Sequence, residues 1–174
     1  MGIQFETDYN METLTAMAKG LRKTVRKKRS RRVHIFAAVV LILGLLTILA
    51  TTAGGEPLGA SGVVTLLAML VVILVSLFED KLNAWFARKR LLPGTEHAAA
   101  TFEEDGYVSA TGVTESRFSY AQIVAVAETA RYFVFALSSH HTQAYDKRTI
   151  RGGSVEDFRA FIAEKTGKPV AEIK

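Results

Sequence analysis

The adjacent pair His140-His141 is the most evident candidate for metal or proton chemistry in this sequence. Zinc sites in proteins bring together three or four ligands. No third ligand stands at helical or strand spacing from the pair, and adjacent residues in a turn point in different directions. We therefore interpret the two histidines as part of a turn and predict no metal site.

Carboxylates gather at 103–105, and Gly106 follows them directly. A short acidic segment that ends in glycine is typical of a solvated turn between two strands. We therefore predict a hairpin turn at this position rather than a pair of catalytic carboxylates.

The residue types and motifs of the sequence give little support to other kinds of enzyme chemistry. The sequence contains no cysteine, which excludes disulfides, cysteine metal sites and a cysteine nucleophile. It also has no glycine-rich phosphate loop and no nucleophile elbow. We predict no catalytic or cofactor-binding residues and no cofactor. For a membrane-bound enzyme, the alternative with least support, the best candidates would be His140, His141 and Glu128.

Two segments, 33–53 and 58–78, are almost entirely apolar and contain no Lys, Arg, Asp or Glu. Each has about 21 residues, or about 31 Å as a helix, which matches a hydrocarbon core of about 30 Å. We therefore predict two transmembrane helices. Gly54, Gly55, Pro57 and Gly59 break the helical pattern and favour a reversal into an antiparallel hairpin, whose connector carries one charge, Glu56.

Basic residues stand at both outer ends of this hairpin, so the positive-inside rule places both termini in the cytoplasm. They abut an apolar span instead of covering a folded surface, and we therefore predict no nucleic-acid partner. The expected partner is the lipid bilayer with its anionic phospholipid headgroups. The residues predicted to contact the membrane surface are Arg26, Lys27, Lys28, Arg29, Arg31, Arg32, Trp85, Arg88, Lys89 and Arg90.

The interior of both spans lacks ionisable side chains, which are the usual mark of ion and proton pathways. This absence disfavours a transporter. A small transporter or channel subunit, formed when the hairpin assembles into a homo-oligomer, stays open as an alternative.

The N-terminal segment 1–32 has two parts. Ile3, Phe5 and Thr7 alternate with polar residues and could add an edge strand to a sheet. The residues from 11 to 25 carry an apolar stripe on a basic helix, which either lies on the membrane or covers the folded domain. After the second span, the helix is expected to continue into segment 79–94, where Pro93-Gly94 ends it.

Segment 95–174 changes character to short β-prone runs separated by turn residues. A helix follows: Ser154 and Asp157 have the spacing of a capping box, and Gly167 ends the helical pattern. The segment predicts a small antiparallel sheet or partial barrel that the C-terminal helix closes, so the chain is an α+β membrane protein. Strands are expected within 101–108 on both sides of the acidic turn, at 117–120, around 123–129, at 132–137 and at 143–146.

Several short motifs, together with the order of a basic segment and two spans before them, resemble the YcxB-like family of bacterial membrane proteins. The resemblance implies a C-terminal domain similar to pleckstrin-homology (PH) folds, a location in the bacterial cytoplasmic (inner) membrane and no catalytic reaction. The motifs are Phe102-Glu103-Glu104-Asp105-Gly106, Tyr120-Ala121-Gln122-Ile123, Val126-Ala127-Glu128-Thr129, Phe133-Val134-Phe135 and Asp146-Lys147-Arg148.

The resemblance singles out Glu128 and Lys147-Arg148. Glu128 stands among apolar strand residues, and we expect an ion pair or a strand-end contact inside the domain. The alternative is that Lys147, Arg148 and Arg151 bind an acidic peptide or a lipid headgroup. Taken together, the sequence predicts a binding or regulatory module that the hairpin tethers at the cytoplasmic face, with a protein partner whose identity the sequence does not give.

Overall fold

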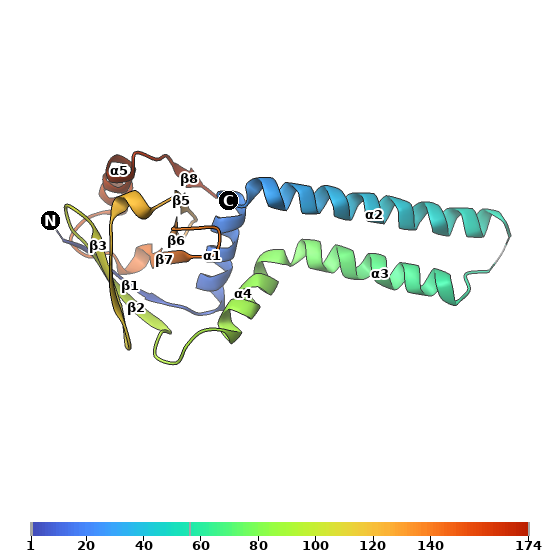
Figure 1. Ribbon diagram of the computed structural model, residues 1–174, viewed down its shortest axis with the longest axis horizontal. Helices are drawn as coiled ribbons and strands as arrows, with labels where there is room; N and C mark the ends of the chain where they lie inside the picture. The colour runs from blue at the N-terminus through green and yellow to red at the C-terminus, as the bar shows by residue number, and fades with distance from the viewer. Residues whose placement is uncertain (1, 56, 174) are drawn as a thin grey trace.

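The computed structural model describes residues 2–55 and 57–173, so that Glu56 of the predicted connector lies outside the described residues. A domain with two β-sheets lies at one end of the molecule, and two long helices extend from it side by side (Figure 1). The helices are α1 (Met11–Lys23), α2 (Lys27–Ala53), α3 (Ala60–Leu77), α4 (Glu79–Lys89) and α5 (Val155–Thr166). The strands are β1 (Ile3–Asp8), β2 (His97–Phe102), β3 (Tyr107–Thr111), β4 (Glu115–Phe118), β5 (Ala125–Glu128), β6 (Tyr132–Ala136), β7 (Thr142–Asp146) and β8 (Val170–Glu172).

The two long helices, α2 and α3, are long and apolar enough to cross a membrane. In the most apolar 18-residue stretch of each, 0% of α2 and 6% of α3 is buried inside the protein. A core helix of a soluble domain would be covered by its neighbours, whereas these side chains face outward. The exposed apolar surface is therefore matched to lipid.

Contacts inside the hairpin are close and apolar. At Gly44 of α2, a Cβ atom would lie 2.8 Å from the sulfur of Met69 on α3, so only glycine fits against that side chain as it stands. The hydroxyls of Thr47 and Thr65 each donate to a carbonyl one turn earlier in their own helix, at 2.9 Å. The hydrogen-bonding capacity of these two hydroxyl donors is therefore met within their own helices.

The helix after the second span differs from the prediction in one respect. It does not run on as one helix, because α3 ends at Leu77 and α4 begins at Glu79 in a different direction (Figure 1). Asp80 in the first turn of α4 forms an ion pair with Arg22 of α1, 2.6 Å between Nη2 and Oδ2. This pair holds α4 along α1, so the chain bends at Phe78.

The first sheet has the strand order β1-β2-β3-β4, with every neighbouring pair antiparallel. Its β1 comes from the N-terminal segment and pairs with β2 along its whole length, with Phe5 opposite Ala100. The predicted edge strand is confirmed. The hairpin and its flanking helices are therefore inserted between two neighbouring strands of one sheet.

The second sheet has the order β7-β6-β5-β8, in which β5 and β8 are parallel and the other pairs are antiparallel. Both sheets contribute aromatic side chains to a common core, on which Phe158 of α5 packs. Phe5 lies 4.7 Å and Phe102 4.8 Å from Phe158, measured between ring centroids. The domain is thus held by an aromatic cluster that joins the two ends of the chain.

The C-terminal helix begins and ends where the sequence predicts. The Ser154 hydroxyl accepts a hydrogen bond from the Asp157 backbone N–H, the Asp157 carboxylate accepts one from the Ser154 backbone N–H, and the helix ends at Gly167. Phe158 and Ile162 are fully buried. The helix closes the core, as expected.

Two strand predictions need correction. The third predicted strand lies at Glu115–Phe118 instead of 117–120, because Ser119 caps a short 3-10 turn that contains Tyr120. The Tyr120 hydroxyl donates to the carbonyls of Glu103 and Gly106, at 2.6 and 3.0 Å, and so binds this turn to the acidic hairpin. The short strand β8 after Gly167 was not predicted at all.

The N-terminal helix α1 covers the domain. Leu14 and Leu21 from its apolar stripe are buried, and Thr13 donates a hydrogen bond to the hydroxyl of Tyr132 on β6, at 3.1 Å. At Gly20 a Cβ atom would lie 2.8 Å from a methyl group of Val134. The open question of where this helix lies is answered in favour of the domain.

Candidate functional site

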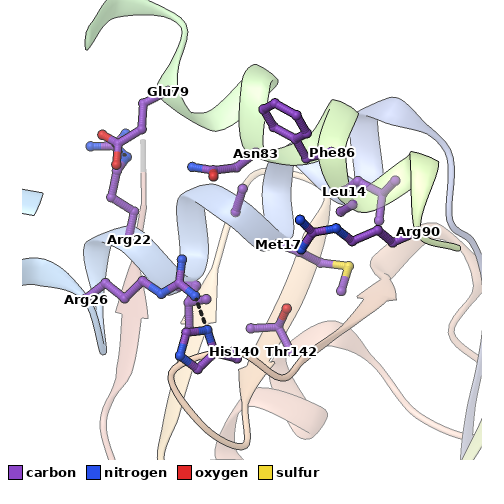
Figure 2. A pocket seen from close by; sticks show the side chains of 13 residues that line it. Leu14, Met17, Arg22, Arg26, Glu79, Asn83, Phe86, Arg90, His140 and Thr142 are labelled. Carbon is purple, nitrogen blue, oxygen red and sulfur yellow. Dashed lines mark hydrogen bonds and ion pairs between the residues drawn. The ribbon is translucent and has the colours of Figure 1, made fainter. Parts of the chain in front are cut away.

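A pocket of about 310 Å³ lies at the junction between the domain and the hairpin. It is enclosed by α1, α4 and the turn between β6 and β7 (Figure 2). We call it the junction pocket. The residues that line it are Leu14, Met17, Ala18, Leu21, Arg22, Arg26, Glu79, Asn83, Phe86, Ala87, Arg90, His140 and Thr142.

One part of the junction pocket is apolar. Leu14 and Met17 belong to the stripe of α1, and Phe86 comes from α4. The stripe buries Leu14 against the domain but leaves Met17 half-buried, and Phe86 is exposed. The pocket therefore offers hydrocarbon contacts on two facing helices.

The positive charge of Arg22 is compensated by an ion pair inside the protein. Its Nε and Nη2 atoms donate to the two carboxylate oxygens of Asp80, at 2.7 and 2.6 Å. The bidentate bond raises the pKa of the Arg22 guanidinium above its ordinary value. A carboxylate oxygen of Glu79 also lies 3.8 Å from Nε of Arg22 and 3.8 Å from Nε2 of His34. Arg22 is thus a link between α1 and α4.

Arg26 and Arg90 differ from Arg22 because no carboxylate of the described residues lies within ion-pair distance of either. The Nε atom of Arg26 donates to the carbonyl of Ser139, at 2.6 Å, and Nη2 lies 2.9 Å from Nδ1 of His140. Arg90 extends from the end of α4 on the other side of the pocket (Figure 2). Two guanidinium groups therefore face the pocket with their charge uncompensated.

The sequence-predicted basic cluster of the domain lies elsewhere, on the side of β7 and the turn that follows it. Lys147 donates to Glu128 at 2.9 Å, and its side chain is 14% exposed. Arg148 is bound to Asp146, and Arg151 lies 3.4 Å from Glu6. The side chains of Arg148 and Arg151 are 65% and 68% exposed, so each keeps an open face beside its internal partner.

Glu128 is the centre of the expected ion pair. Besides Lys147, it accepts two hydrogen bonds from Arg159 of α5, at 2.6 and 2.7 Å. These bonds, those of Arg159 first, hold the pKa of the buried Glu128 carboxyl below its ordinary value. Glu128 therefore fastens α5 to the second sheet, which is a structural role.

The two histidines lie on the turn between β6 and β7, as predicted. The hydroxyl of Ser138 accepts hydrogen bonds from the backbone N–H groups of His140 and His141, at 3.1 and 3.0 Å. Within the ranges that the structure describes, no three His, Asp or Glu side chains are grouped so that they could hold a metal ion. The acidic segment 103–105 also forms the predicted turn between β2 and β3, and Glu104 bonds to Lys165.

Most of the predicted membrane-surface residues are exposed near the base of the hairpin. On α4, the ammonium group of Lys89 lies 3.7 Å from the ring centroid of Trp85. Arg26 and Arg90 are the two that also line the junction pocket. The exposed residues are Lys27, Lys28, Arg29, Arg31, Arg32, Trp85, Arg88, Lys89 and Arg90, whereas Arg26 is half-buried.

The sequence reasoning did not bring together the residues that form the junction pocket. The apolar stripe of α1 was visible, but Phe86, Asn83 and His140 lie on segments far from it in the sequence. No local pattern indicates that the β6–β7 turn reaches the start of α2. Only the docking of α1 between the second sheet and α4 brings these residues together.

Comparison with protein families gives one match: residues 102–162 match the model of the family described as YcxB-like protein. Comparison with curated proteins and with solved structures gives no match. The matched segment runs from the last residue of β2 through β3 to β7 and into α5. It contains all the motifs on which the resemblance rested. Residues 102–162 therefore form a YcxB-like domain, in agreement with the family that the motifs indicate.

Proposed function

We propose that the protein is a binding or regulatory module of the bacterial cytoplasmic membrane, tethered by its hairpin with the folded domain at the cytoplasmic face. The observation that carries this proposal is the pairing of β1 with β2. One strand precedes the hairpin and the other follows it, so a hairpin that crosses the membrane twice leaves both in the same compartment. The basic residues beside the domain favour the cytoplasm as that compartment.

The arrangement of the domain supports the further proposal of a PH-like fold. A sheet of four antiparallel strands is followed by three more antiparallel strands, β5 to β7, and then by a helix that closes the core. In this proposal the hairpin is an insertion between the first and second strands, and β8 is an addition. Folds of this kind present sheet edges and loops to partners, which suits a binding module.

Labelling of single introduced cysteines tests the topology, because the chain has no cysteine of its own. Gly59→Cys lies in the connector before α3, and Ser138→Cys lies on the β6–β7 turn. In intact cells, a membrane-impermeant maleimide should label G59C, whereas S138C should react only after the membrane is permeabilised. Labelling of S138C in intact cells, or release of the protein by a carbonate wash, would contradict the proposal.

A further inference from the structure

We propose that the junction pocket binds the phosphate group of an anionic phospholipid, with Arg26 and Arg90 as the phosphate ligands and the apolar side chains of α1 and α4 beside the lipid glycerol and acyl chains. This inference rests on the proposed function, because it assigns a ligand to the place where the tethered domain meets the membrane. It assigns one defined site, in contrast to the diffuse attraction of a basic surface for lipid.

The charge of the pocket favours an anion with oxygen acceptors. Arg22 is compensated by Asp80 and Glu79, but Arg26 and Arg90 have no carboxylate partner among the residues that the structure describes. A guanidinium group presents several N–H donors in one plane and binds phosphate through paired hydrogen bonds. The Nε atom and one Nη atom of Arg26 bond to the β6–β7 turn, which fixes the position of the guanidinium group. The other Nη atom of Arg26 stays available for a ligand.

The apolar part of the pocket favours a phosphate that carries hydrocarbon. Met17 and Phe86 line the same pocket as the two arginines. Methionine adapts its shape to irregular apolar ligands, and an aromatic ring offers a large contact surface. An inorganic anion would leave these groups in contact with water, whereas a glycerol backbone and the first acyl carbons would cover them.

The pocket lies next to the expected depth of the lipid headgroups. Arg26 immediately precedes α2, and Glu79 follows the end of α3. Val33, where the predicted apolar span begins, is seven positions after Arg26, which corresponds to about 10 Å along a helix. The headgroup region is about 5–7 Å deep on each side of the hydrocarbon core. The backbone of Arg26 therefore lies a few ångströms outside the headgroup region, and in this proposal the pocket faces the lipid phosphates.

The experiment uses the full-length protein in a neutral detergent and native mass spectrometry to count bound molecules. The probes are dioctanoyl phosphatidylglycerol, dioctanoyl phosphatidylcholine and inorganic phosphate. The variants are R26Q and R90Q in the pocket, with R88Q as the matched control, because Arg88 belongs to the same last turn of α4 but does not line this pocket. All three variants remove one positive charge.

One phosphatidylglycerol molecule should bind per chain, more tightly than phosphatidylcholine. R26Q and R90Q should each weaken its binding by about tenfold, since each removes a charge-assisted hydrogen bond. R88Q should weaken it by less than about twofold, because only screened long-range attraction is lost. Equal losses in R88Q and R90Q would overturn the site, and binding of inorganic phosphate as tight as that of phosphatidylglycerol would overturn the assignment to lipid.

Two further measurements separate the loss of the lipid site from a loss of stability and from a wrong topology. Arg26 binds the β6–β7 turn, so thermal unfolding of R26Q shows whether the domain keeps its stability, while the exposed Arg90 provides a variant without that complication. Cysteine labelling tests the proposed topology separately. A domain at the wrong face with intact lipid binding would refute the proposed function, whereas the predicted topology with no lipid-specific binding would refute the junction site alone.

Discussion

Several charged side chains of the domain form ion pairs with one another. Glu128 compensates Lys147 and Arg159, and Asp146 compensates Arg131 and Arg148. Buried ion pairs of this kind seldom add much net stability compared with apolar residues, but the loss of one partner leaves a charge uncompensated. Arg26 and Arg90 have no such partner among the described residues, and they differ from the other basic residues beside the hairpin because both line the junction pocket.

Replacement of Glu128 by Gln should destabilise the protein by about 2–3 kcal/mol at neutral pH, because Lys147 and Arg159 lose their shared carboxylate. The pKa of Glu128 is lower in the folded than in the unfolded protein. Its contribution is therefore fully present above the unfolded value of about 4.3 and is lost as the pH falls through the folded value. Chemical unfolding of the wild type and E128Q at neutral and acidic pH measures this difference.

Glu156→Gln is the matched control for this prediction. Glu156 also faces Arg159, at 3.9 Å, but its side chain is 75% exposed, so its removal should change the free energy of unfolding little. A difference between E128Q and the wild type that stays constant down to acidic pH would show that Glu128 does not stabilise the fold through its charge.

At the scale of elements, the features with a local signal could be predicted from the sequence. Length and composition identify both apolar helices, and Ser154, Asp157 and Gly167 define α5 because capping acts within a few residues. The acidic turn before Gly106 gives the β2–β3 hairpin for the same reason. The residues that determine each of these elements lie close together in the sequence, so the sequence alone predicts them.

Elements that depend on distant partners could not be predicted in the same way. Strand β8 has only three residues and forms by parallel pairing with β5, some forty residues earlier in the chain. The docking of α1 depends on Val134 and Tyr132, and the bend at Phe78 depends on Arg22. The junction pocket depends on the contacts of α1 with the second sheet and with α4. The sequence therefore showed the apolar stripe and placed Arg26 and Arg90 near the membrane surface, but it did not bring them together in one pocket.

The N-terminal strand should be essential for the stability of the domain. Phe5 is 1% exposed and packs against Phe102, Tyr145 and Phe158, so F5A should lower the free energy of unfolding by about 3–4 kcal/mol. Gln4→Ala, on the exposed side of the same strand, should change it by less than about 0.5 kcal/mol. Chemical unfolding of the full-length variants in neutral detergent tests both.

Similar losses in F5A and Q4A would mean that β1 is held by its backbone pairing alone. Since Phe5 belongs to the shared core, a fragment of residues 92–174 lacks part of that core and should not fold by itself.

At the scale of the whole molecule, the domain and the hairpin are connected as one unit by α1 and α4. Helix α1 packs on the second sheet with one face and on α4 with another. Because α4 follows the second apolar helix directly and α1 precedes the first, both outer ends of the hairpin are held by the domain. The hairpin and the sheets are therefore joined through these two helices.

The Arg22–Asp80 pair should carry a measurable part of this connection. The two side chains are only 22% and 16% exposed and form two parallel hydrogen bonds, so water screens the pair less than a typical surface ion pair. A double-mutant cycle with R22A and D80A should give a coupling free energy of about 1–2 kcal/mol. The corresponding cycle for Arg117 and Glu103, which are 4.0 Å apart and mostly exposed, should give a value near zero. Additive effects of R22A and D80A would mean that apolar packing alone joins α1 to α4, and the bend at Phe78 would then need another cause.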